Sequence, residues 1–134
     1  MTADLLSVIM SDEEHSQEEA YERLANGEHV DDPALVSDSD ELQAVLDAND
    51  VVVVDFYADW CGPCQMMDSV LETLAGEPAP IVKVDVDASE KLTSSYEVRS
   101  LPTYIIFVDG QPEEELTGIQ EEDEFRDTIS EHVA

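Results

Sequence analysis

The stretch VVVVDFYADWCGPCQMM, residues 51–67, contains both cysteines of the chain, separated only by Gly62 and Pro63. Its first seven residues form an apolar run interrupted by one aspartate, which is typical of a strand buried on both faces of a sheet. From Cys61 onward the apolar residues recur with helical spacing as far as Gly76, where the pattern stops. The stretch therefore predicts an inner strand followed by a helix whose first turn carries a thiol.

The same alternation of strand-like and helix-like runs continues on both sides of this stretch. Runs separated by helices favour parallel pairing, whereas the Asp109-Gly110 turn favours a hairpin, so the sequence predicts an α/β fold with a central mixed sheet and helices on both faces. The other predicted strands are at about 34–36, 81–87, 102–108 and 113–118, and the other helices at about 39–48, 89–98 and 121–133.

A further helix is predicted in the acidic segment that precedes this alternation. SDEE at residues 11–14 has the form of a capping box, and ANG at 25–27 supplies a helix stop, so the helix spans about 12–25. Its apolar stripe, Ala20, Tyr21 and Leu24, is narrow. The sequence leaves open whether this helix packs on the main domain, binds a partner or stays a solvated extension.

The composition is strongly acidic, with 34 Asp and Glu residues against 5 Lys and Arg and a formal net charge of −29. Such a surface repels nucleic acid and anionic lipid, so neither is expected as a partner. At molar salt the screening length falls to about 3 Å, which relieves the repulsion within the folded chain. We therefore expect a halophilic protein from a high-salt cytoplasm, with an acidic but merely soluble protein as the alternative.

No part of the chain predicts a route to a membrane. There is no run of the roughly 18 apolar residues that a spanning helix needs, and Asp4 stands where a signal peptide would carry a basic residue. A cytoplasmic location is therefore expected, and there two closely spaced cysteines indicate a metal half-site or a redox pair.

Three chemistries can use Cys61 and Cys64. Zinc would need two further ligands, but the three histidines, His15, His29 and His132, do not stand at ligand spacing, so no metal site is expected. A structural disulfide would close so small a loop that it would stabilise the fold little. The remaining chemistry is a cycling dithiol, in which Cys61 at the helix start is the nucleophile and Cys64, expected to be more buried, resolves the mixed disulfide.

Asp55 and Lys83 are two charged residues inside predicted inner strands. A buried carboxylate is costly in its ionised form, so Asp55 is expected to be partly protonated and is a candidate proton acceptor. Lys83 lies in the neighbouring strand and could pair with Asp55. The alternative is that Asp55 lies on an exposed edge strand and Lys83 is solvated.

With these residues in view, the chain resembles the thioredoxin family over roughly residues 34–134. The centre of the resemblance is WCGPC, in which Trp60, Gly62 and Pro63 accompany the two cysteines, and Asp55 and Lys83 fall where the family keeps a buried aspartate and its lysine partner. The resemblance implies the thioredoxin fold for residues 33–134. The acidic extension, residues 1–32, has no counterpart in the minimal family fold.

Two further segments carry the resemblance. RSLPTYIIF, residues 99–107, is similar to the family's cis-proline segment, which implies that the bond from Leu101 to Pro102 is cis and faces the cysteines. TGI, residues 117–119, is similar to the glycine rim of the family's substrate groove, which implies substrate contacts at Gly118 and Ile119. The chain departs from the family at Gln65, Ser69 and Tyr57, where a basic residue, a helix-kinking proline and a tryptophan are common.

The resemblance implies a protein-disulfide reductase and thiol electron carrier with no cofactor beyond the Cys61–Cys64 disulfide. Its expected partners are disulfide-containing proteins and a thioredoxin reductase. The alternatives are an oxidase or isomerase, which the Gly-Pro dipeptide disfavours, and a non-catalytic binding module that uses the N-terminal helix.

Overall fold

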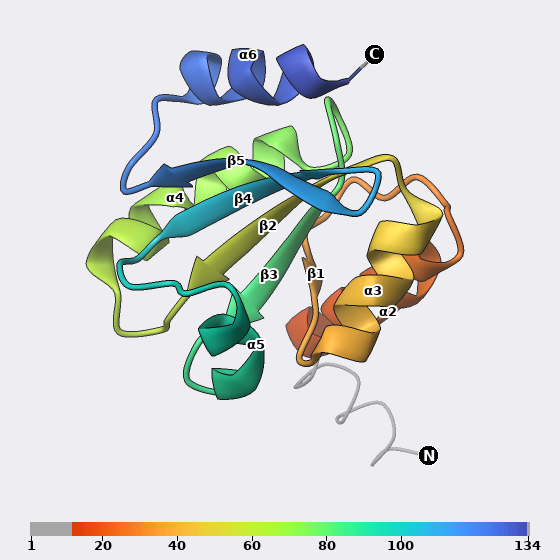
Figure 1. Ribbon diagram of the computed structural model, residues 1–134, viewed down its shortest axis with the longest axis horizontal. Helices are drawn as coiled ribbons and strands as arrows, with labels where there is room; N and C mark the ends of the chain where they lie inside the picture. Colours follow the sequence, from red (N-terminus) through yellow and green to blue (C-terminus); the bar gives the residue numbers. More distant parts are fainter. Residues whose placement is uncertain (1–11, 134) are drawn as a thin grey trace.

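Strand β2 (Val51–Tyr57) is the middle strand of a five-stranded mixed sheet with the order β1-β3-β2-β4-β5. The structure is a computed structural model, and it describes residues 12–133. β2 runs parallel to β3 (Ile81–Asp85) and antiparallel to β4 (Thr103–Val108), as Figure 1 shows. The edges are β1 (Ala34–Leu35), parallel to β3, and β5 (Gln111–Thr117), antiparallel to β4. The predicted mixed sheet is confirmed.

Helices cover both faces of the sheet, and the alternation of side chains along β2 explains why. Val52, Val54 and Phe56 point to one face and Val53 to the other, and all of them are buried, so this strand has apolar residues at consecutive positions and not only at alternate ones. The helices contributing to the core of the first face are α2 (Asp12–Ala25), α3 (Ser39–Ala48) and α5 (Glu90–Ser95), and those of the second are α4 (Gly62–Leu74) and α6 (Glu122–His132).

Helix α2 packs on the domain through Ala20 and Leu24 of its apolar stripe. Ala20 and Leu24 are buried in the same core cluster as α3 and β1, and the Asn49 side-chain amide donates to the Leu24 carbonyl at 2.9 Å. Gly27 then ends the helix in the left-handed conformation, at φ 79°. The predicted capping box at residues 11–14 begins outside the described residues.

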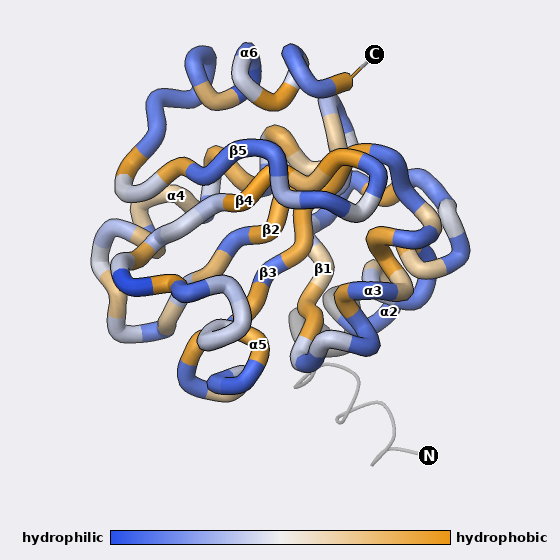
Figure 2. The backbone as a smooth tube through the Cα atoms, viewed as in Figure 1, coloured by the Kyte–Doolittle hydropathy of each residue, from blue (hydrophilic) through white to orange (hydrophobic). Residues whose placement is uncertain are grey.

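Hydropathy follows the layers of the fold. Figure 2 shows hydrophobic residues concentrated on the inner strands, while much of α6 and of β5 is hydrophilic. None of the described helices is both long enough and apolar enough to cross a membrane. Among the described residues the buried polar ones are Ser89, Thr103 and Asp55, and Asp55, on the second face of β2, is the one with an ionisable side chain.

Candidate active site

The first thiol lies at the junction between β2 and α4. Cys61 is the N-cap of α4, with extended backbone at φ −86° and ψ 109°, and its Sγ accepts a hydrogen bond from the Cys64 N–H at 3.2 Å. Pro63 stands in the first helical turn, where its missing N–H leaves no helix hydrogen bond unmade. The unpaired amides and the dipole of the helix start favour negative charge on the Cys61 sulfur.

Cys61 and Cys64 form a disulfide, with their Cα atoms 5.3 Å apart. The expectation that Cys64 is the more buried thiol is wrong for this oxidised form, because each cysteine is 5% exposed. The bond holds both sulfurs in one apolar niche against Ala58. The two cysteines nevertheless differ in access, since the lining of the adjacent groove includes Cys61 but not Cys64.

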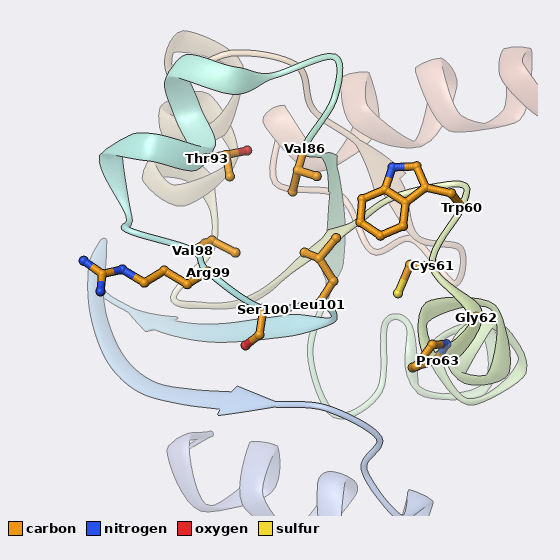
Figure 3. A pocket seen from close by; sticks show the side chains of 10 residues that line it. All are labelled: Trp60, Cys61, Gly62, Pro63, Val86, Thr93, Val98, Arg99, Ser100 and Leu101. Atoms are coloured by element: carbon orange, nitrogen blue, oxygen red, sulfur yellow. The ribbon is translucent and has the colours of Figure 1, made fainter.

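This groove, here called the thiol groove, opens beside Cys61. Figure 3 shows Trp60, Gly62 and Pro63 on the side of the cysteine and Leu101 on the other side. Trp60 is 70% exposed, and its indole N–H donates to Asp87 Oδ2 at 2.7 Å. A large apolar side chain held in place at an open site suits contact with another protein.

The groove also contains residues that the sequence did not predict. Val86 and Val98 add apolar surface, and Arg99 brings one of the few basic groups of the chain to its rim. The position of Arg99 could have been predicted from the sequence, since Arg99 begins the RSLPT segment. No sequence pattern indicates the two valines, because their position depends on where the loops after β3 and α5 meet.

The proline segment has the conformation that the resemblance implies. The Leu101–Pro102 peptide bond is cis, and the Pro102 carbonyl accepts the Gly118 N–H at 2.9 Å. Gly118 has a φ of 82°, which favours glycine. Ile119 beside it is 54% exposed. Gly118 is thus brought to Pro102, although neither Gly118 nor Ile119 is among the groove-lining residues.

Asp55 is buried in the central strand, as predicted, and is 1% exposed. Desolvation raises the pKa of its carboxyl to about 7, against a lowering by Lys83 and with a further rise from Asp68. Its Oδ1 atom has no hydrogen-bond partner among the described residues. Near neutral pH the carboxyl can therefore both take up and release a proton.

Lys83 lies opposite Asp55 in the register of β2 and β3, but its ammonium group does not pair with it directly. Within residues 12–133, the ion pair of Lys83 is with Asp68, at 3.4 Å from Nζ to Oδ1. The same Nζ lies 4.3 Å from the centre of the Tyr57 ring. The expected Asp55–Lys83 pair is thus replaced by a longer-range interaction, because Asp68 and Tyr57 offer Lys83 a position nearer to solvent.

The departures from the family motif have local structural roles. The Gln65 side chain donates to the Asp59 carbonyl at 2.7 Å and so ties α4 to the preceding loop. Ser69 lies within α4, which continues without interruption to Leu74. In the described part of the chain, no group of three or more His, Cys, Asp or Glu residues is arranged to hold a metal ion.

A mixed sheet whose central strand leads into a helix capped by one cysteine of a disulfide, next to a cis-proline, defines the class of thioredoxin-fold thiol-disulfide oxidoreductases. The family model described as thioredoxin matches residues 33–131. The chain therefore belongs to the thioredoxin family.

Individual relatives agree with this assignment. Thioredoxin of Staphylococcus epidermidis is 43% identical over 86 residues, which are 62% of this chain and 83% of the relative. Thioredoxin of Chlamydia trachomatis is 44% identical over 87 residues, which are 63% of this chain and 85% of the relative. Among solved structures, a single-substitution mutant of thioredoxin from Halobacterium salinarum NRC-1 is similar with a TM-score of 0.75 and 48% identity, over 78% of this chain and 93% of that one.

The family membership and the cysteine pair together establish the activity. The protein is a thiol-disulfide reductase and electron carrier, and the redox-active group of its family is the disulfide itself, with no further cofactor needed.

Proposed function

We propose that Cys61 attacks the substrate disulfide, that Cys64 resolves the resulting mixed disulfide, and that Asp55 accepts the Cys64 proton. The observation that carries this assignment is that Cys61 both caps α4 and lines the thiol groove, whereas Cys64 does not line it. A nucleophile must be reachable and must be stabilised as a thiolate, and Cys61 meets both conditions.

The reaction then has two exchange steps. The Cys61 thiolate forms a bond to one sulfur of the substrate disulfide, and the other substrate sulfur leaves as a thiolate with the electron pair of the broken bond. Asp55 takes the proton of the Cys64 thiol, and the Cys64 thiolate attacks Cys61 Sγ. The second substrate sulfur leaves as a thiolate. The substrate has gained two electrons, and the protein is left as the disulfide.

We assign the substrate contacts to the residues around the groove. The backbone of the substrate lies along Leu101, which lines the thiol groove together with Cys61, and along Pro102, which follows Leu101 through the cis bond. Its flanking side chains contact the apolar surface around the thiol. The residues proposed for this surface are Trp60, Gly62, Pro63, Gly118 and Ile119.

Disulfide-containing proteins are the substrate class of the family, and we propose that a thioredoxin reductase returns the electrons in the cytoplasm. Trapping with Cys64→Ser in a cell lysate tests both partners, since this variant cannot release the mixed disulfide. Substrate proteins bound through Cys61 are expected, and release of all of them without reductant would contradict the resolving role of Cys64.

Reduction of insulin disulfides with dithiothreitol as electron source tests the assignment of the nucleophile. The Cys61→Ser variant is expected to lose all activity above the background given by dithiothreitol alone, because no other thiolate faces the groove. Activity equal to that of the wild type would show that the assignment is wrong.

We also propose that the protein is adapted to high salt, because its net charge of −29 is carried on a chain of only 134 residues. The midpoint of thermal unfolding is expected to rise between 0.1 M and 3 M KCl as the repulsion is screened. A midpoint that stays constant or falls over this range would contradict the adaptation.

A further inference from the structure

Asp68 is a carboxylate on the active-site helix that the reaction scheme does not use. It stands four residues after Cys64, one turn further along α4 and therefore on the same side of the helix. Its side chain is 52% exposed, and its Oδ1 lies 3.4 Å from Lys83 Nζ. Asp68 thus reaches solvent and contacts Lys83, the strand neighbour of the buried Asp55.

Lys83 lies between two carboxylates that differ in burial. Asp55 is its register partner on β2, is almost fully buried, and lacks a partner for Oδ1 among the described residues. Asp68 is half-exposed and holds the ammonium group directly. The Tyr57 ring, 4.3 Å from Nζ, supports the ammonium in that position. An ammonium group that is drawn toward Asp68 compensates the charge of Asp55 less well.

We propose that Asp68 is a positioning residue, which holds the Lys83 ammonium toward solvent and thereby keeps the buried Asp55 carboxyl protonated up to a higher pH. The inference deepens the proposed function, since it rests on the role of Asp55 as proton acceptor. Asp68 acts through Lys83 and does not touch the reacting sulfurs.

The charged groups around Asp55 support the proposal that Asp68 favours the protonated form of the Asp55 carboxyl. Asp68 raises the pKa of Asp55 and Lys83 lowers it, both in addition to the larger effect of desolvation. The pKa of Tyr104 is itself raised by burial, so this residue stays neutral. The titratable groups on the elements around Asp55 are Tyr57 on its own strand, Lys83 and Asp85 on β3, Tyr104 on β4, and Asp68 and the exposed Glu72 on α4, while Cys64 on α4 is in the disulfide and does not titrate.

The titration of Asp55 in the oxidised full-length protein tests the inference, because the disulfide removes the thiols from the titration. In Asp68→Asn the Lys83 ammonium is free to approach Asp55, and the midpoint of the Asp55 carboxyl resonance followed by carbon-13 NMR is expected to fall by about one pH unit. An unchanged or higher midpoint would overturn the inference.

Glu72→Gln is the matched control. Glu72 lies one turn further along α4, is exposed, and makes no ion pair with Lys83 in the described part of the chain. The substitution removes the same charge from the same helix, so it should leave the Asp55 midpoint where it is in the wild type. An equal fall in both variants would mean that helix charge in general is responsible, and the inference would be wrong.

A double substitution separates positioning from direct repulsion. If Asp68 acts through Lys83, then Asp68→Asn should shift the midpoint less than half as far in a Lys83→Met background as in the wild type. The full shift in that background would overturn the positioning role. The pH profile of insulin reduction is the separate test of the proposed function, which fails if Asp68→Asn moves the Asp55 midpoint but leaves the profile in place.

Discussion

The two faces of β2 differ in the kind of side chain that they bury. On one face Val52, Val54 and Phe56 are fully buried beneath α2 and α3 in an apolar cluster. On the other face the corresponding row contains Val53 and then Asp55, whose carboxyl is buried beneath α4 without a complete set of partners among the described residues. The first face is wholly apolar along this strand, whereas the second gives up part of its apolar packing to a buried carboxyl, to which we assign proton transfer as a proposal.

Truncating the apolar face should have the largest effect on stability. Phe56→Ala removes a side chain that is fully buried and is expected to lower the free energy of unfolding by about 3–5 kcal/mol. Urea unfolding measures this loss. Insulin reduction by the fraction that remains folded should be close to that of the wild type, and a specific loss of turnover would show that the two faces are not separate in function.

Replacing the acid on the other face should have the opposite effect on stability. Asp55→Asn removes the desolvation cost of a buried, imperfectly paired carboxylate, so the free energy of unfolding at neutral pH is expected to rise by about 1–4 kcal/mol. Release of the mixed disulfide should become slower, while the first attack by Cys61 changes less. A less stable variant with wild-type exchange rates between pH 6 and pH 9 would make Asp55 a structural residue.

Per pH unit, the pH dependence of stability is the smallest of these effects, and it distinguishes the two faces without a redox assay. The pKa of Asp55 is about 7 in the folded state, whereas the ordinary value of 3.8 applies to the unfolded chain. Between these two pH values the folded chain therefore binds more protons than the unfolded one. The contribution of Asp55 is fully present below pH 3.8 and declines as pH rises to about 7, by at most about 1.4 kcal/mol per pH unit.

Comparison of the wild type with Asp55→Asn isolates this contribution from that of the many other carboxylates. Their difference in free energy of unfolding should be small near pH 4 and grow up to about pH 7. A difference that is constant with pH would show that Asp55 does not titrate in this range.

Much of the site could be predicted from the sequence because it is local in the chain. The strand before Cys61, the helix after it and the Gly-Pro turn lie within one continuous stretch, so the position of the thiol at a helix start follows from short-range patterns. The proline segment was predicted through its resemblance to the family, and its cis bond is confirmed. The assignment of catalytic and substrate roles to individual residues stays a prediction.

Other features depended on contacts between distant segments. The packing of α2 could not be predicted, since a narrow stripe of Ala20 and Leu24 suffices only where α3 and β1 complete the surface. The partner of Lys83 was predicted as Asp55, because adjacent strands bring the two residues into register. The competing carboxylate, Asp68, comes from a helix that crosses the sheet, which no strand pattern reveals.

The sequence by itself determined the class of the fold, the middle strand, the dithiol and the burial of one acid, because alternation, helix periodicity and the CGPC spacing are properties of neighbouring residues. Only the tertiary structure decided which thiol faces the groove, which side chains line that groove, and which carboxylate holds Lys83. Those outcomes depend on distances between atoms far apart in the chain, and electrostatic and packing energies change steeply with such distances.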